Sequence, residues 1–553
     1  MKRFYSLALL AALFVFSCDN TSTIEETAEV SAEDTPNYLE LGVMCGTVQF
    51  TDGCSPQIDS LIQFGLALVH HMTYEDAEYN FNKVVKLDPD CFWGHWGRAM
   101  TYIHPVWPDS PSKERMRRGL GLARKALGLA KNERESLFGE ALLAYYENGK
   151  DKSELERLTS YEAAWKKASD TRPDDIEARL FHGLCRLGTV SPSDKSYQVQ
   201  REVGAMAEDV LLEISDHPGG FHYAIHAYDF PPLASDAMRV ANNYAEIAPE
   251  IPHALHMPTH IFTRLGYWQE SIDMNIRSAN AAWTLPADGN VSLHYFHALD
   301  YLVYAYLQKS QSKKAYDIVA GIDTIYQTFQ SHSVTAYALA AMPARLVLEN
   351  QDWEAASKLE LRYDDYFTWD KFPQFASLSH FAKGVGGARI GNTEIAQEAF
   401  DILDSIHSEL KESPSLAYWA KQVEIQKTAV KGWHSYASGN KSEGMAIMNE
   451  AALMEASTEK SPVTPGELLP VREMLGDLYL AENNPELALE NYKLTLERNP
   501  NRFNALYGAG KAAEMLNKTD EARKFYSSLL QLGDFENSTK LQIKDARSAL
   551  ASG

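Results

Sequence analysis

Positive charge and enzyme signatures are both scarce in this sequence of 553 residues. It holds 52 Lys and Arg against 75 Asp and Glu, which gives a formal net charge of −23. Binding to a nucleic-acid backbone requires clustered Lys and Arg, so we expect no nucleic-acid partner. Neither a Gly-x-Ser-x-Gly segment nor a glycine-rich phosphate loop before a strand is present. Hydrolase and nucleotide-binding functions therefore have no support.

Long apolar runs are missing beyond the N-terminus. Lys2 and Arg3 precede an apolar run from Phe4 to Phe16, which is too short for a hydrocarbon core of ~30 Å, and no later run approaches ~18 apolar residues. We therefore expect no transmembrane helix in the mature protein and predict a signal peptide over residues 1–17. The sequence across its end, residues 15–18, is Val-Phe-Ser-Cys, which resembles the lipobox of bacterial lipoproteins. The resemblance implies that Cys18 is lipidated, becomes the first residue after cleavage and anchors the chain.

Residues 18–40 form an acidic, Ser- and Thr-rich stretch after the lipidated cysteine. It has too few apolar residues to fold and is predicted to be a flexible tether. An acidic residue directly after the cysteine, here Asp19, resembles the surface-export signal of Bacteroidota lipoproteins, whereas in enterobacteria aspartate there implies inner-membrane retention. Which membrane holds the protein thus depends on the host; we expect lipid anchoring in the outer membrane, with surface exposure as an open alternative.

Small and large residues recur with a period of 34 at both ends of the remaining chain. This is the pattern of tetratricopeptide repeats, in which small residues lie where two antiparallel helices touch and a large residue fills the space beside them. The matching residues are Gly476, Tyr479, Ala488, Tyr492 and Pro500, then Gly510, Ala513, Ala522 and Tyr526, and near the N-terminus Phe64, Gly65, Leu68, Ala77, Phe81 and Pro89. Strand-like alternation is nearly absent. The predicted fold is all-α, a tetratricopeptide-type α-solenoid of antiparallel helix pairs.

The repeats divide the chain into four predicted regions. These are N-terminal repeats over 41–180, a histidine-rich central region over 181–300, degenerate helical repeats over 301–460 and a C-terminal repeat pair over 461–553. Proline and glycine interrupt the helical periodicity between them.

Five cysteines leave four after lipidation of Cys18. Cys45 and Cys54 flank a short loop just before the first repeat, so a local disulfide between them is one expectation for an exported protein. Cys91 and Cys185 lie in helical, aromatic-rich stretches and are expected to be buried thiols.

Histidine placement does not follow from a plain repeat scaffold. His222 and His226 are four residues apart, as are His256 and His260, with His253 one turn earlier. Each pair lies on one face of a helix, and imidazole is a common ligand of zinc and copper. These five histidines with Asp229 form a candidate site for a metal or polar ligand. The alternative is structural, because the prolines of this region leave carbonyls that imidazoles can satisfy. A catalytic metal site is the weakest of the three readings, since no His-Glu-x-x-His motif is present.

Three segments resemble an uncharacterised family of bacterial tetratricopeptide proteins, often lipoproteins. They are Pro218 to His226, Pro252 to Phe262 and Phe64 to Leu68. The resemblance implies the fold and export and carries no settled activity onto these positions.

The function expected first is a membrane-anchored scaffold of the cell envelope that binds a protein or peptide partner, because helical arrays present a concave groove. One alternative is an accessory role in polysaccharide utilisation, since 28 Tyr and 10 Trp offer faces for sugar rings. Another is metal binding, or a metal-dependent enzyme, through the central histidines. We expect no enzyme activity and no cofactor, with zinc or copper as the exception that the histidines allow.

Overall fold

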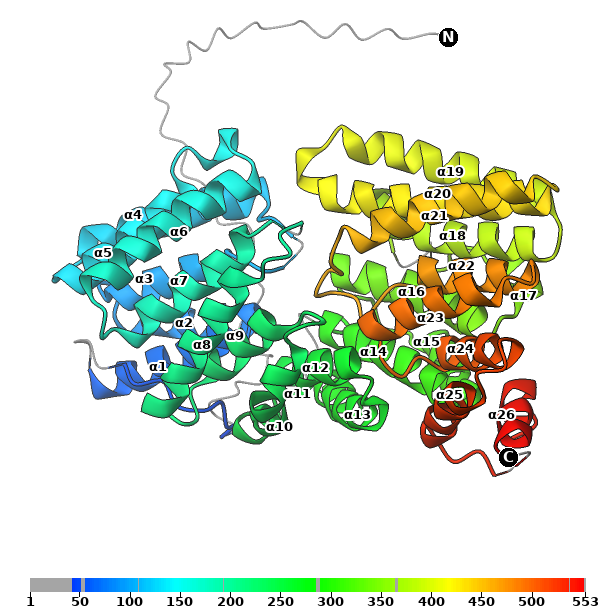
Figure 1. Cartoon of the computed structure of the whole chain (residues 1–553). Coiled ribbons are helices and arrows are strands. Elements are labelled where there is room, and N and C mark those ends of the chain that lie inside the picture. Colours follow the sequence, from blue (N-terminus) through cyan, green and yellow to red (C-terminus); the bar gives the residue numbers. More distant parts are fainter. Residues whose placement is uncertain are drawn as a thin grey trace, which may run out of the picture. The chain divides into compact units, whose positions relative to one another are not determined.

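The computed structural model describes residues 42–50, 55–107, 109–191, 193–284, 289–363, 367–536 and 538–551. Across these residues the chain is a succession of helices joined by short turns (Figure 1). The described residues show strand-like pairing only as an isolated bridge between Val291 and Phe329. The all-α prediction is confirmed. The predicted signal peptide, Cys18, the tether and Cys54 lie outside the described residues.

The first twelve α-helices carry the N-terminal repeats and most of the central histidines. They are α1 (Pro56–His70), α2 (Tyr74–Leu87), α3 (Phe92–Met100), α4 (Lys113–Leu129), α5 (Glu133–Tyr146), α6 (Glu154–Thr171), α7 (Ile176–Thr189), α8 (Gln198–Glu213), α9 (Pro218–Tyr228), α10 (Met238–Ile247), α11 (Pro252–His256) and α12 (Pro258–Leu265).

The remaining α-helices run to the C-terminus. They are α13 (Trp268–Thr284), α14 (Leu293–Gln308), α15 (Ser312–Ile322), α16 (Ser333–Glu349), α17 (Trp353–Ser357), α18 (Pro373–Arg389), α19 (Thr393–Lys411), α20 (Ala417–Ala437), α21 (Lys441–Ala456), α22 (Val471–Ala481), α23 (Pro485–Arg498), α24 (Phe503–Met515), α25 (Thr519–Gln531) and α26 (Leu541–Ala551). Four single-turn 3-10 helices are η1 (Gly149–Asp151), η2 (Ala234–Ala237), η3 (Trp369–Lys371) and η4 (Pro414–Leu416).

The helix pairs pack where the repeat pattern predicts. A Cβ placed on Gly476 of α22 would lie 2.9 Å from the ring of Tyr492 on α23, and one on Gly510 of α24 would lie 2.5 Å from Tyr526 on α25. Only glycine permits such approach of one helix backbone to an aromatic ring. The small and large positions of the 34-residue pattern are therefore partners across each pair, as the template requires.

The turns between paired helices are tight because single residues adopt left-handed backbone conformations. Asn483 between α22 and α23 has φ +54°, and Asn517 between α24 and α25 has φ +57°. Asparagine tolerates this conformation better than most non-glycine residues, so each connection needs only a few residues and neighbouring helices run antiparallel.

Two hydrophobic clusters make up the core. One spans Cys45 to Phe262 and the other Trp268 to Ala546. Helix α11 packs on α13 and α14, and α12 packs on α13, so the two clusters meet along these helices. The histidine-rich segment therefore lies at this junction. Among the described helices, none combines the length and apolar character needed to cross a membrane.

The cysteines differ from the prediction. Cys45 is a buried free thiol, and burial raises its pKa to about 12. The expected Cys45–Cys54 disulfide is therefore wrong, because Cys45 packs into the N-terminal core, where its carbonyl contacts His71. Cys91 is disulfide-bonded, so it is not the buried thiol expected, whereas Cys185 is one.

Candidate metal centre

Proline fixes where the histidine-bearing helices begin. Helices α9, α11 and α12 start with Pro218, Pro252 and Pro258 in their first turns. Proline is tolerated there because the first N–H groups of a helix have no internal partner. The i, i+4 spacing then places His222 and His226 on one face of α9.

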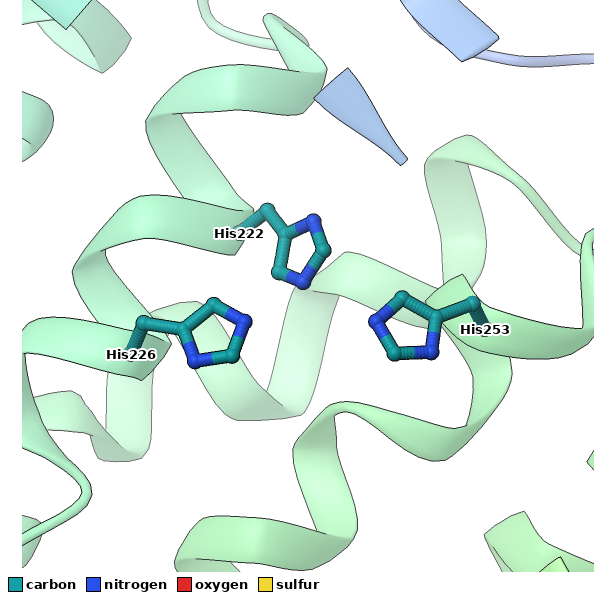
Figure 2. Close-up of side chains that lie close together, drawn as sticks. All are labelled: His222, His226 and His253. Atoms are coloured by element: carbon teal, nitrogen blue, oxygen red, sulfur yellow. The ribbon is translucent and has the colours of Figure 1, made fainter. Parts of the chain in front are cut away.

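The first trihistidine set consists of His222, His226 and His253. One ring nitrogen from each lies within 4.8 Å of the other two, and all three side chains are buried. Their rings point into one shared space, with two coming from α9 and the third from α11 opposite (Figure 2). The ring centroids of His222 and His226 are 4.8 Å apart, and those of His222 and His253 are 5.0 Å apart.

Most nitrogens of the first set have no hydrogen-bond partner among the described residues. His222 donates from Nδ1 to the carbonyl of His70 at 2.6 Å, which leaves a lone pair on its Nε2. That Nε2, Nε2 of His226 and both nitrogens of His253 are buried and unpartnered. Burial lowers the pKa of His222 and His253 well below the ordinary value and that of His226 to about 3. The three imidazoles are therefore neutral and keep free lone pairs.

The second trihistidine set consists of His256, His260 and His297. Its ligand nitrogens also lie within 4.8 Å of one another. His256 comes from α11, His260 from α12 and His297 from α14. His297 is not among the predicted site residues. Its sequence signal is polarity on a helix that is mostly apolar and almost wholly buried.

Hydrogen bonds fix the ring tautomers of His256 and His260. The amide of Asn275 donates to the carbonyl of Ser271 at 2.9 Å, so its oxygen accepts from Nδ1 of His256 at 2.7 Å. The Asp229 carboxylate accepts from Nδ1 of His260 at 2.9 Å. Both Nε2 atoms are therefore acceptors, and they face each other at 3.1 Å.

Two lone pairs at this distance repel unless a cation lies between or beside them. A proton is disfavoured, because burial and the neighbouring histidines hold the pKa of His256 well below its ordinary value and burial lowers that of His260. Two imidazole nitrogens bound to one tetrahedral ion lie about 3.3 Å apart, from bond lengths of about 2.0–2.1 Å. The 3.1 Å separation matches ligands of one metal ion.

Asp229 orients the site and belongs to neither ligand set. Its Oδ2 contacts His260 and, at 2.9 Å, Nζ of Lys460, while Oδ1 accepts from Nε of Arg264 at 2.8 Å. Burial alone would raise the pKa of Asp229, but the charges of Lys460 and Arg264 outweigh it and keep that pKa well below the ordinary value. A carboxylate that fixes a ligand histidine from behind is common at metal sites. The predicted direct role for Asp229 is replaced by this indirect one, and Lys460 was not predicted at all.

The two sets adjoin each other. Ring centroids of His226 and His260 are 6.2 Å apart, as are those of His253 and His256. All five predicted histidines thus come together, as expected, but they divide three and two between the sets, and His297 completes the second.

A third group, formed by His70, Glu177 and His217, is also buried but contains a carboxylate and is closed by its own hydrogen bonds. His70 bonds Tyr223 at 2.9 Å and Glu177 at 2.7 Å. His217 accepts from the backbone N–H of Gly219 at 3.1 Å and contacts Glu177 at 3.2 Å. All four ring nitrogens are used, so the imidazoles of this group offer no free lone pair to a metal.

No family model and no curated protein matches the chain. Solved structures do match over most of its length. A crystal structure of the P58(IPK) TPR domain is 15% identical, covers 84% of this chain and 99% of its own, and has a TM-score of 0.19. A monomeric mutant of IFIT1 with Gppp-AAAA is 12% identical, with coverages of 87% and 96% and a TM-score of 0.35. The human IFIT1 dimer with m7Gppp-AAAA is 11% identical, with coverages of 88% and 96% and a TM-score of 0.36. At these TM-scores the solenoid assignment rests on the chain's own helix pairs.

Proposed function

We propose that the protein binds a transition-metal ion at the second trihistidine set. The observation that carries this proposal is the 3.1 Å approach of the two Nε2 acceptors of His256 and His260, each with its Nδ1–H already committed. A metal ion relieves this repulsion without paying for a buried imidazolium. Neutral nitrogen donors of this kind suit zinc, copper, nickel and iron.

The proposal concerns binding and not catalysis. Hydrolysis at a metal needs a general base beside the open coordination position. Asp229 is the carboxylate nearest the second set, and its oxygens are taken by His260, Lys460 and Arg264. It is placed to hold a ligand and not to accept a proton from water.

Metal analysis of purified protein tests this function. We expect wild-type protein to retain a stoichiometric transition metal after gel filtration, and His256→Ala and His297→Ala to lose the ion bound at this set. The matched control is His71→Ala, because His71 is equally buried but bonds Tyr244 at 2.8 Å and the Cys45 carbonyl at 3.0 Å. Wild-type protein that takes up no metal, even when reloaded, would overturn the proposal.

We place this metal protein at the cell envelope, held by a lipid on Cys18 and the acidic tether that follows it. The support is the N-terminal sequence alone. Cys18→Ala should release the protein from the membrane fraction, and labelled palmitate should be incorporated by wild type and not by the variant. Equal fractionation of the two would contradict the anchor.

A second candidate function is capture of a protein or peptide partner, or of a glycan, between the degenerate helical repeats and the C-terminal repeat pair. A cavity of about 450 Å³ opens there, and aromatic rings line it together with an ion pair between Arg389 and Asp477. The rings are those of Trp433, Tyr436, Tyr492 and Tyr507. Aromatic faces with a few fixed polar groups are typical of ligand pockets.

Peptide and glycan arrays probed with wild-type and Tyr507→Ala protein decide this candidate. Tyr507 is only half-buried, so its removal should leave the fold intact while weakening any binding in the cavity. Array signals that are the same for the two proteins would exclude this cavity.

A further inference from the structure

We infer that the first trihistidine set is a metal site in its own right, so that the cluster holds a pair of copper ions. This inference rests on the proposed function, since it adds a second ion beside the one at His256, His260 and His297. It assigns His222, His226 and His253 as ligands of that second ion.

The unpartnered nitrogens of the first set carry the assignment. A buried polar atom without a hydrogen bond costs about 1–3 kcal/mol, and His253 has two such atoms, while His222 and His226 each have one. Histidines that serve packing alone would find donors or be replaced by apolar residues. Instead, His222 has its tautomer set from behind by the His70 carbonyl, as ligand histidines usually do.

The way the two sets share helices makes them a pair. His253 and His256 are one turn apart on α11 and serve different sets, while His226 of α9 and His260 of α12 are in ring contact across the boundary. Each set supplies three protein ligands, and the described His, Cys, Asp and Glu residues add no fourth to either.

The neutral ligands favour copper. All six are imidazoles, so none of them offsets the charge of a bound ion, and Asp229, which supports His260, is already paired with Lys460 and Arg264. The cost of burying an ion rises with the square of its charge, so a monovalent ion is buried most cheaply, and copper has such a state whereas zinc does not. In its divalent state copper also leads the affinity series for nitrogen ligands.

The test is an anaerobic titration of metal-free protein with Cu(I) against a chromophoric Cu(I) chelator. We expect two equivalents for wild type, one for His226→Ala or His253→Ala, one for His297→Ala and none for the combination of His253→Ala with His297→Ala. His71→Ala should keep two. Gln variants at the same positions and far-ultraviolet circular dichroism guard against loss of fold.

The outcomes separate the inference from the function beneath it. One equivalent in wild type that His297→Ala abolishes and His253→Ala leaves unchanged overturns the second site while the proposed function stands. No uptake in any protein overturns both. Zinc displacing Cu(I) when the two are supplied in equal amounts overturns the choice of copper.

Proximity of the ions has its own readout. After oxidation to Cu(II), the electron paramagnetic resonance intensity of wild type should fall below the sum of the intensities of His253→Ala and His297→Ala, because neighbouring spins couple. An intensity equal to that sum would show two independent ions and overturn the pair.

Discussion

Two regions of this molecule gather buried histidines, and they treat the ring nitrogens in opposite ways. In the group around Glu177, every ring nitrogen of His70 and His217 forms a hydrogen bond within the protein. In the trihistidine sets, four nitrogens lack a partner among the described residues and two others face each other as acceptors. The histidines of both regions are buried. Hydrogen-bond completeness is what distinguishes a structural histidine from a candidate ligand.

A large loss of stability from a single substitution is expected where the closed group is broken. Glu177→Ala removes the acceptor of both His70 and His217 and should lower the free energy of unfolding by about 3–5 kcal/mol. Thermal melting followed by circular dichroism measures this loss. The control is Glu162→Ala. Glu162 lies 2.9 Å from Nε2 of His182, and both side chains are partly exposed, so its loss should lower the free energy of unfolding by about 1 kcal/mol or less. Equal losses in the two variants would contradict a structural role for the Glu177 group.

Metal removal tests whether the two trihistidine sets bind ions. Each ion bound only by the native state stabilises it by about 4 kcal/mol when its free concentration is about 1,000 times Kd. Chelation should therefore lower the melting temperature of wild type and leave that of the His253→Ala, His297→Ala double variant unchanged. If chelators leave the melting temperature of wild type unchanged, the trihistidine sets are structural, like the group around Glu177.

The pH dependence of stability tests His71, a buried histidine whose two ring nitrogens both form hydrogen bonds and whose imidazole is neutral. Burial lowers its pKa from 6.5 to about 3, so below pH 6.5 the unfolded chain takes a proton there that the native chain refuses. Native stability should fall as pH decreases from 6.5 towards 3, by about 1.4 kcal/mol per pH unit from this histidine. Melting curves of metal-free wild type and His71→Leu across this range should show a shallower pH slope for the variant. Parallel slopes would contradict the neutral assignment.

The smallest expected change in stability, that of His253→Leu, best distinguishes a ligand histidine from a structural one. His253→Leu replaces two unsatisfied nitrogens with an apolar side chain of similar size and should raise the stability of metal-free protein by about 1 kcal/mol. His71→Leu at an equally buried site should instead destabilise, because it orphans the hydroxyl of Tyr244 and the carbonyl of Cys45. Denaturant titration of the two variants compares these signs. A loss of stability in both would make His253 structural.

The fold was readable from the sequence because its signals are local. Gly476 and Tyr492, like Gly510 and Tyr526, lie within one repeat and meet across a single helix pair. The i, i+4 spacing likewise placed His222 and His226 on one face of α9, whereas the expectation of a single helix for His256 and His260 was wrong, because they lie on two successive helices, α11 and α12. Both kinds of signal depend only on helical geometry over a few tens of residues.

The parts of the site that were missed depend on contacts between distant segments. His297 reaches the site from α14, and Lys460 from a loop beyond α21. Asp229 seemed suited to be a ligand until Lys460 and Arg264 were found to occupy its oxygens. The disulfide of Cys91 was missed for the same reason, since position along the chain does not determine which thiols meet in a folded array.

The ion pair between Lys460 and Asp229 spans 231 residues, and this separation sets an order of assembly. All six imidazoles have been synthesised once residue 297 is made, but the carboxylate that orients His260 gains its second cation only when the chain extends beyond residue 460. A ribosome completes the ligands first and their support much later. The supported metal centre therefore forms only in a chain that includes Lys460. A C-terminal truncation that removes Lys460 but no ligand histidine should be enough to weaken metal binding.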